Sequence, residues 1–359
     1  MAGGSQATTQ RFSTVGPGLL AAVLFGATAP LCKVLLGDAA PFTLAALVYL
    51  GSGIGLAAWM VVRRVLDAGR GKALGLRGAD WFTLGAAVAA GGILAPTLFL
   101  VGLSASQASA ASLLLNLELV FTTLLAWALF REGFEGRVAW GLAIILAGCI
   151  VLAWPGGGFQ GWGRGALPIA GACLCWGLDN NLTQRLAARD PIQIATIKGL
   201  AGGTVNAALA LALGESFPAA TPVLAALCVG FCGYGLSLVL FVVSLGRMGT
   251  TRTIGVFAAA PFVGSCLSFW ILGEVPRLSS FLAAALLLVG LIVALGGGHA
   301  HAHAHAAEVH AHRHYHDEHH RHGHGGSEAG DEPHDHAHRH EPLEHAHPHY
   351  PDTHHRHRH

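Results

Sequence analysis

Four charged residues stand within long apolar stretches of the sequence: Lys33, Glu118, Asp179 and Lys198. A charge at membrane depth costs at least about 2.5–3.5 kcal/mol on insertion scales, so such a residue tends to face a partner or a wet cavity. Asp179 and Lys198 fall at a similar depth, about 9–10 Å from the same membrane face at 1.5 Å per helical residue. We therefore expect an ion pair between them, either within a binding site or as a structural lock between consecutive helices.

Glu118 lies near the centre of its apolar stretch. A carboxyl group at this depth could take up and release a proton, which suits proton-coupled exchange. The alternative is a structural hydrogen bond between helices. Lys33 is close to the outer end of its stretch, where it could contact a substrate or extend to the membrane interface. Other candidate substrate-site residues in the same helices are polar or aromatic: Asn180, Asn181, Trp176 and Tyr234.

Histidine is confined to the end of the chain. All 23 histidines lie between His299 and His359. Neutral imidazole is a good ligand for zinc, nickel and copper, and repeated His-x-His pairs offer several adaptable sites. The candidate metal ligands are His299, His301, His303, His305, His310, His312, His314, His316, His334, His336, His338, His340, His345, His347 and His349.

The histidine-rich tail, 298–359, contains almost no large aliphatic residue, so we expect it to be disordered without a ligand. Bound zinc, nickel, cobalt or copper is expected there, and no cofactor is required elsewhere. A pH-responsive segment is the alternative. Its formal charge would change from −5 with neutral histidines to +18 with protonated ones, and a positive tail would be drawn to an anionic membrane surface.

The body that must position the four charges is strongly apolar. Only 11% of the whole chain is charged, against about 25% in soluble proteins. A helix needs roughly 20 apolar residues to cross a bilayer, and ten such helices are predicted. We therefore expect an all-α integral membrane protein. The predicted spans are 15–37, 41–62, 80–103, 107–130, 137–154, 165–187, 191–213, 221–245, 251–272 and 278–297.

Lysine and arginine indicate the orientation of the body. If the N-terminal segment 1–14 is cytoplasmic, the inside loops carry twelve Lys and Arg residues and the outside loops carry two. This is a strong positive-inside bias. We expect a multi-pass protein of a bacterial inner membrane, with the N-terminus and the tail in the cytoplasm.

The body contains an internal repeat. Residues 98–132 align with 240–274 at a constant offset of 142. Gly26 matches Gly177, and Pro41 matches Pro191. Each unit has five helices, an odd number, so the second copy is inverted, as in many secondary transporters. The expected units are 15–154 and 165–297, joined by a linker at 155–164.

These features resemble the EamA-type transporters of the drug/metabolite transporter superfamily over about 15–297. The resemblance rests on the stretch 115–121 leading to Phe130-Arg131-Glu132, and on Ala260-Pro261-Phe262 leading to Leu272-Gly273-Glu274. In that family a proline commonly occupies the position of Leu119 and Pro261, so the first repeat departs from the pattern. Glu132, Glu274 and Pro261 are expected to be structural, because the two glutamates end equivalent helices.

The resulting functional prediction is a secondary transporter of a small metabolite with a metal-binding tail. No Walker motif or nucleophile elbow is present, so we expect neither an enzyme nor an ATP-driven pump. The alternatives are a nickel, cobalt or zinc exporter fed by the tail, and a membrane-anchored metal-sensing or storage protein. The expected partners are the lipid bilayer, a small-molecule substrate and a divalent transition metal, without nucleic acid. Glycine-rich spacings at 51–55 and 199–203 suit helix packing within one chain or in a homodimer.

Overall fold

The computed structural model describes residues 15–66, 76–130, 136–153, 165–186, 189–295, 299–305, 309–314, 334–339 and 343–349. It divides the chain into a body, Met1–Gly296, and a tail, Gly297–His359. The predicted segments 1–14 and 155–164 lie outside the described residues. So do Glu132, His316 and His340.

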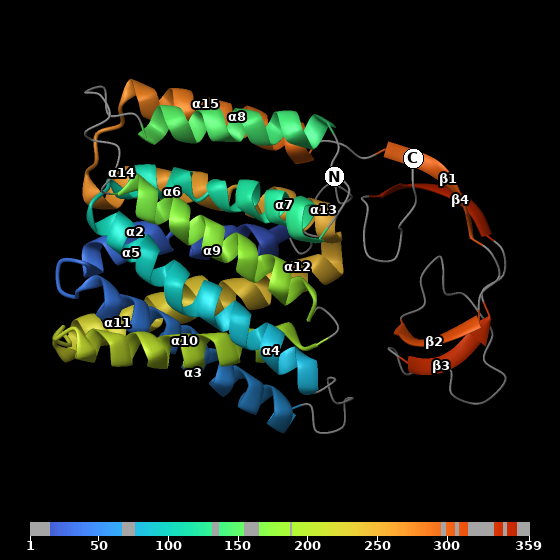
Figure 1. Ribbon diagram of the computed structural model, residues 1–359, viewed down its shortest axis with the longest axis horizontal. Helices are drawn as coiled ribbons and strands as arrows, with labels where there is room; N and C mark the ends of the chain where they lie inside the picture. The colour runs from blue at the N-terminus through green and yellow to red at the C-terminus, as the bar shows by residue number, and fades with distance from the viewer. Residues whose placement is uncertain are drawn as a thin grey trace, which may run out of the picture. The chain divides into compact units, whose positions relative to one another are not determined.

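The body consists of helices throughout its described residues (Figure 1). The first repeat contains a helix at 15–26, α2 (Thr28–Leu35), α3 (Pro41–Leu66), α4 (Gly78–Ala87), η1 (Val88–Leu94), α5 (Ala95–Ser104), α6 (Ala108–Leu114), α7 (Leu117–Phe130) and α8 (Gly136–Ala153). The second contains α9 (Ala166–Gln184), α10 (Pro191–Ala212), α11 (Ala220–Gly230), η3 (Phe231–Leu236), α12 (Ser237–Met248), α13 (Thr250–Phe257), α14 (Ala260–Leu272) and α15 (Leu278–Leu295).

The helices have the length and surface of a membrane protein. Within the described residues, nine helices are long and apolar enough to span a bilayer. The tenth predicted span is present as α9, which is more polar because it carries Asp179, Asn180 and Asn181. Large apolar side chains are exposed on many helices, and Trp270, near the end of α14, is 84% exposed. Exposed tryptophans near helix ends are typical of the membrane interface. The all-α membrane fold predicted for the body is thus confirmed.

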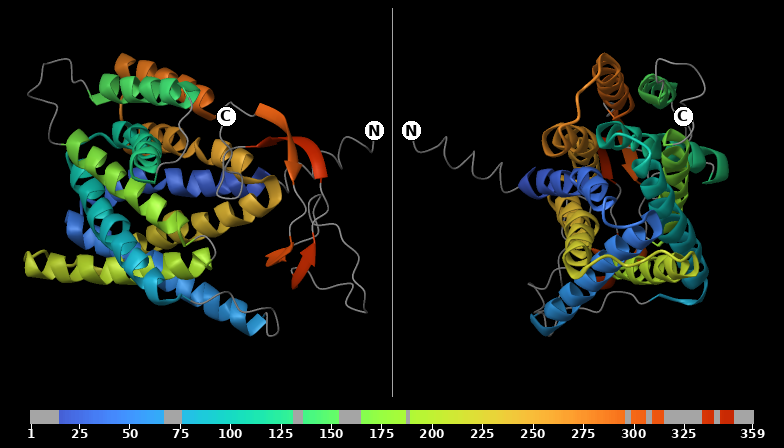
Figure 2. Two further views of the ribbon diagram at one scale, coloured as in Figure 1. Left: turned by 45° about the vertical axis from the view of Figure 1, so that its right-hand side comes forward. Right: turned by 90° about the vertical axis from the view of Figure 1, so that its left-hand side faces the viewer.

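The two repeats pack against each other by pairing equivalent helices. Their second helices, α3 and α10, lie side by side, and so do their fifth helices, α8 and α15. These two pairs form opposite sides of the body (Figures 1 and 2). The first helix of each repeat packs on the other repeat, with α9 against α5 and α7, and α2 against α11 and α14. Pairing of equivalent helices is what a two-fold relation between inverted copies requires.

Matched glycines permit this crossing. A Cβ at Gly26 would lie 2.5 Å from the carbonyl oxygen of Ala260, and one at Gly177 would lie 2.9 Å from the backbone nitrogen of Thr122. Each glycine thus brings the first helix of its repeat against the fourth helix of the other. Likewise, a Cβ at Gly199 would lie 2.7 Å from the Cα of Gly53. The glycine-rich segments 51–55 and 199–203 therefore pack against each other within the chain.

The third helix of each repeat contains a π-helical segment, η1 or η3. Such a segment interrupts the α-helical hydrogen-bond ladder, so its carbonyls can bond to side chains. The carbonyl of Gly91 accepts from Tyr49 Oη at 2.7 Å, and that of Gly92 accepts from Asn206 Nδ2 at 3.1 Å. Asn206 is fully buried. In η3, Ser237 Oγ donates to the carbonyl of Gly233.

The fourth helix of each repeat is broken by a short turn, between α6 and α7 and between α13 and α14. Pro261 lies in the first turn of α14 and has no N–H to donate, which explains the second break. Leu119 replaces proline in the first repeat, yet the break is present. Here Asn116 Nδ2 donates to the carbonyl of Leu113 at 2.8 Å and competes with the helical bonds.

The described part of the tail contains four strands. They are β1 (His299–His305), β2 (Val309–His314), β3 (His334–Arg339) and β4 (Leu343–His349). β1 pairs with β4 and β2 with β3, both antiparallel. At these segments the structure departs from the expected disorder, because alternating His-x-His sequence has the two-residue period of a strand. Isolated two-stranded ladders are at best marginally stable in water.

Candidate substrate site

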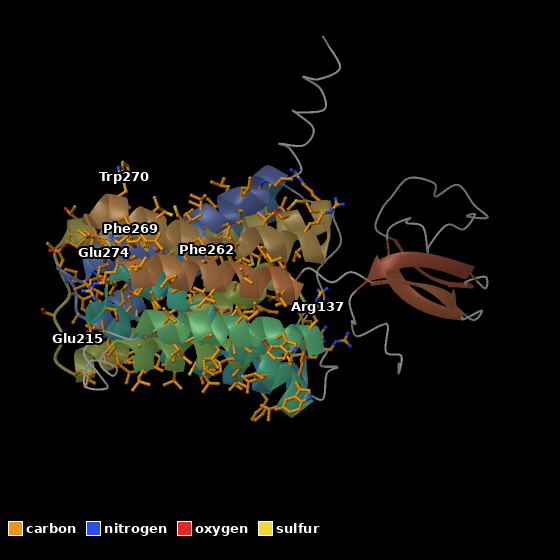
Figure 3. The ribbon with its side chains drawn as sticks, turned by 90° about the horizontal axis from the view of Figure 1, so that it is seen from above. Arg137, Glu215, Phe262, Phe269, Trp270 and Glu274 are labelled. Carbon is orange, nitrogen blue, oxygen red and sulfur yellow. The ribbon has the colours of Figure 1, made fainter. Side chains whose placement is uncertain are left out.

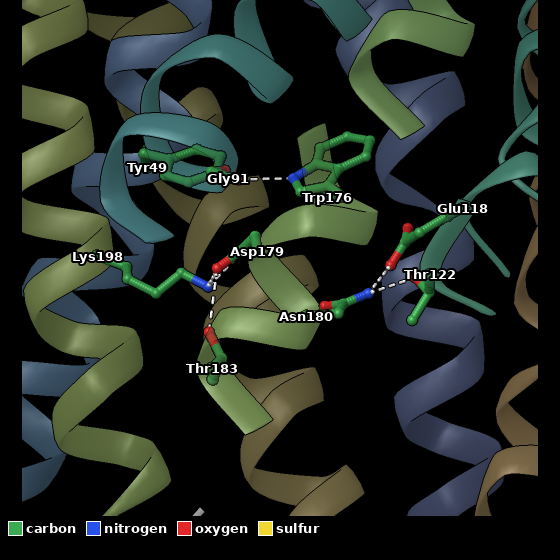
Figure 4. Close-up of polar contacts among 9 residues, drawn as sticks. All are labelled: Tyr49, Gly91, Glu118, Thr122, Trp176, Asp179, Asn180, Thr183 and Lys198. Atoms are coloured by element: carbon green, nitrogen blue, oxygen red, sulfur yellow. Dashed lines mark hydrogen bonds and ion pairs between the residues drawn. The ribbon is translucent and has the colours of Figure 1, made fainter. Parts of the chain in front are cut away.

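The predicted ion pair between Asp179 and Lys198 is present. Lys198 Nζ, on α10, lies 2.7 Å from Oδ1 and 2.5 Å from Oδ2 of Asp179, on α9 (Figure 4). The Asp179 side chain is 5% exposed and that of Lys198 is 19% exposed. Thr183 Oγ1, one turn further along α9, donates to Asp179 Oδ1 at 3.0 Å. Both charges are therefore compensated by a close partner within the helix bundle.

Segment η1 closes one side of this pair. Gly91 lies directly against Asp179, because a Cβ at this glycine would overlap the aspartate carboxylate. The carbonyl of Gly91 is held by Tyr49 Oη, which in turn accepts a hydrogen bond from Trp176 Nε1 at 3.3 Å. Tyr49 thus connects η1 to α9. It was not among the candidates from the sequence, where the Gly91-Gly92 pair is the only signal of close backbone approach.

Glu118, in the first turn of α7, belongs to a second polar cluster, which packs against another face of α9. Asn180 Nδ2 donates to Glu118 Oε1 at 2.8 Å and to Thr122 Oγ1 at 3.3 Å (Figure 4). Asn181 is buried and donates to the carbonyls of Thr122, at 2.9 Å, and Gly177, at 2.8 Å. Glu118 is half-buried and Asn180 is exposed. The structure thus brings Glu118 and Asn180 together and uses Asn181 to join α9 to α7.

Aromatic rings from several helices contact one another in a continuous row. Tyr234 contacts Tyr49, with ring centroids 5.6 Å apart, and Phe25, at 5.8 Å. Phe25 contacts Phe257 at 5.3 Å, and Phe257 contacts Phe241 at 5.0 Å. These five residues, Phe25, Tyr49, Tyr234, Phe241 and Phe257, form what we call the aromatic row. Of them, only Tyr234 was a candidate from the sequence.

Lys33 contacts the C-terminal end of α5. Its Nζ donates to the carbonyls of Leu103, at 2.7 Å, and Ser104, at 3.0 Å, at the end of α5. A cation at a helix C-terminus is favourable for the helix dipole. This geometry offers a structural explanation for Lys33 in place of substrate contact.

Glu274, which follows α14, caps the start of α6. Its carboxylate accepts from the backbone nitrogens of Ala108, at 2.6 Å, and Ser109, at 3.0 Å, at the start of α6. Ser109 Oγ donates to it at 2.5 Å. Figure 3 shows Glu274 and Glu215 at one end of the body and Arg137 at the opposite end. This placement fits the predicted structural role of Glu274.

The described residues contain no group of three or more His, Cys, Asp or Glu that could hold a metal ion. The tail strands are described by their backbone pairing only. In that pairing, His301 lies opposite His347 and His303 opposite His345, while His310 lies opposite His338 and His312 opposite His336. The backbone pairing therefore places histidine positions opposite histidine positions in both ladders.

Comparison with known proteins identifies the family. The EamA-like transporter family profile matches residues 14–154 and 163–296. A protein of Methanothermobacter thermautotrophicus (strain Delta H), described as an uncharacterized transporter, is 28% identical over 297 residues, which cover 78% of this chain and 85% of that protein. A protein of known crystal structure has a TM-score of 0.56 at 23% identity, covering 78% of this chain and 95% of that one.

The two family matches coincide with the two halves whose equivalent helices pair in the structure. The resemblance noted from the sequence is confirmed. The chain belongs to the EamA-like transporter family and is a multi-pass membrane transporter of the drug/metabolite transporter type.

Proposed function

We propose that this protein is a secondary transporter that moves a small metabolite across the bacterial inner membrane, with both termini in the cytoplasm. The observation that carries the proposal is the position of Glu118. It is a half-buried carboxylate beside a break in the fourth helix, where α9 of the second repeat crosses α7 of the first. Substrate sites of inverted-repeat transporters lie at such a junction near the membrane midplane.

The two polar clusters have different roles in this proposal. Glu118 and Asn180 bind the solute, or Glu118 takes up the coupling proton. Among the described residues, Glu118 accepts a side-chain hydrogen bond on Oε1 only. A carboxylate can accept on both oxygens. Asp179 and Lys198 neutralise each other and fix the arrangement of α9, α10 and η1 around the path.

A metal-binding role of the tail is a separate part of the proposal. The tail repeats His-x-His many times, and neutral imidazole is a good ligand for zinc, nickel, cobalt or copper. In the favoured form the tail buffers or senses the metal beside a metabolite transporter. The alternatives are that it feeds metal to the body for export, or that the body only anchors a metal store.

A reconstituted flux screen tests these forms together. Proteoliposomes carrying the full chain, or a chain ending at residue 298, would be offered a metabolite panel and divalent metals under a proton gradient. We expect metabolite flux with both chains and its loss of proton dependence in Glu118→Gln. Metal flux that requires the tail would instead support the alternative in which the protein exports metal. A lack of any flux would refute transport and support the alternative in which the body anchors a metal store.

A further inference from the structure

The two π-helical segments occupy equivalent positions in the two repeats, because every residue of η3 aligns with η1 at the constant offset of 142. Each segment places a glycine against the first helix of the other repeat. A Cβ at Gly91 of η1 would overlap the Asp179 carboxylate, on α9. A Cβ at Gly233 of η3 would overlap the methyl group of Thr28, on α2. We call these two contacts the Asp179 junction and the Thr28 junction.

The two junctions are related by the inverted repeat. The first helices of the repeats align at an offset of 151, which matches Gly26 with Gly177. The same offset matches Thr28 with Asp179. Because each repeat has five spans, its first helix crosses the membrane in the direction opposite to that of the other repeat. The Asp179 junction and the Thr28 junction therefore lie in opposite halves of the membrane.

Ion pairing distinguishes the Asp179 junction from its equivalent. Lys198 Nζ lies 2.7 and 2.5 Å from the two carboxylate oxygens of Asp179. In the other repeat, Val48 takes the place of Lys198, since both residues stand seven positions after the proline that begins the second helix. Thr28 Oγ1 donates within its own helix, to the carbonyl of Phe25 at 2.6 Å. A hydroxyl and an aliphatic side chain thus replace the two charges in the Thr28 junction.

Segment η1 packs on both members of the ion pair. Gly91 contacts the Asp179 side chain, and a Cβ at Gly92 would lie 3.3 Å from the carbonyl oxygen of Lys198. The pair therefore joins α9 and α10 into one surface on which η1 is seated. Separating two part-buried charges leaves each without its partner, which is costly. The seat of η1 is held together by this cost, whereas Thr28 and Val48 provide no such tie beneath η3.

We propose that the Asp179–Lys198 pair makes the two halves of the transport cycle unequal, by favouring the state in which the Asp179 junction is closed. This inference rests on the proposed function, in which the two ends of the path open in turn. Under the proposed orientation, the favoured state is closed toward the cytoplasm. Asp179 and Lys198 are then positioning residues, which act through the seat of η1.

Hydrogen exchange of the full-length protein in nanodiscs, followed by mass spectrometry, compares the two junctions. After correction for the intrinsic rates of the sequence, exchange in η1 should be at least about tenfold slower than in η3, because exchange in a folded segment reports its local opening. Equal rates, or slower exchange in η3, overturn the inference. This measurement uses the wild-type protein and does not depend on the folding of any variant.

A double variant tests the role of the pair. Asp179→Thr with Lys198→Val gives this junction the side chains of its equivalent. We expect exchange to become faster in η1 and slower in η3, because the population shifts from one state to the other. A pair that only stabilises its own surroundings would speed exchange in η1 and leave η3 unchanged, which would overturn the inference.

Thr97→Val is the matched control for this double variant. It removes a buried hydrogen bond of 3.0 Å from Thr97 Oγ1 to Asn206 Oδ1, which links α5 to α10. Exchange in η3 should not change in this control, and equal slowing there would contradict a specific role of the ion pair.

Flux in proteoliposomes separates this inference from the proposed function. Solute flux in wild type, without slower exchange in η3 of the double variant, would support secondary transport and overturn the unequal cycle. Opposite changes in η1 and η3, without flux of any solute, would support the unequal junctions and refute transport.

Discussion

Gly91 of η1 lies against the carboxylate of Asp179 of α9, so closely that a Cβ at position 91 would overlap Oδ2. The π-helical turn and the missing side chain together let the third helix of the first repeat approach the ion pair. Because Tyr49 binds the Gly91 carbonyl, α3 is tied to the same point. Four helical elements thus meet at Asp179: α3, η1, α9 and α10.

Gly91→Ala is expected to disrupt this junction. The added methyl group must displace the Asp179 carboxylate or move η1, and overpacking of this kind costs typically about 1–3 kcal/mol. Thermal unfolding in detergent, followed by tryptophan fluorescence, measures the effect. Gly85→Ala in α4 is the matched control, since its Cβ would meet nothing within 4 Å. Equal stability of the two variants would show that the contact with Asp179 is not restrictive.

The Asp179–Lys198 pair should show strong coupling between its two members. Asp179→Asn or Lys198→Met alone leaves one charge without its partner, which costs about 3–5 kcal/mol for a buried pair. The partial exposure of Lys198 places the expected loss toward the lower end. The double variant should recover much of the stability, because it removes both charges. A double-mutant cycle from unfolding in mixed micelles measures the coupling, and additive losses would contradict it.

The same cycle distinguishes a structural pair from a solute-binding one. If the double variant folds and retains flux in proteoliposomes, the pair only positions α9 and α10. If it folds and loses flux, one of the two charges acts on the solute directly.

Helix positions could be predicted from the sequence because length and composition determine them in a membrane. Pro41 and Pro191 begin α3 and α10 as expected, since proline at a helix start loses no hydrogen bond. The constant offset of 142 likewise predicted the matched third and fourth helices. The breaks inside those helices were not predicted in full. The one at Asn116 depends on a side chain that bonds its own backbone, without the proline that marks such a break.

The division of the site into two clusters could not be read from the sequence. Asp179 and Asn180 are neighbours and were assigned to one substrate site. On a helix they are about 100° apart, so Asp179 meets α10 and η1 while Asn180 meets α7. Which faces meet depends on the crossing of the repeats. The aromatic row was missed for the same reason, since Phe25, Tyr49 and Phe257 come from three different helices.

Glu274 is expected to stabilise the start of α6. Its replacement by alanine removes the acceptor for two backbone N–H groups and one hydroxyl. Loss of a capping carboxylate costs about 0.5–2 kcal/mol. Thermal unfolding and hydrogen exchange at residues 108–110 measure the loss, which should be local. Asp38→Asn, at an exposed loop acid, is the control, and faster exchange in that variant as well would refute a specific cap.

The tail should account for the transition-metal binding of the whole protein. We expect the full chain to bind several Ni²⁺ or Zn²⁺ ions at pH 7.5 and to release them by about pH 5.5, because protonated imidazole is not a ligand and unperturbed histidine titrates near pH 6.5. A chain of the same length with every tail histidine replaced by asparagine keeps the neutral-state charge and should bind none. Bound metal is measured by mass spectrometry after dialysis. Equal metal content in both chains would place the ligands in the body and refute the tail sites.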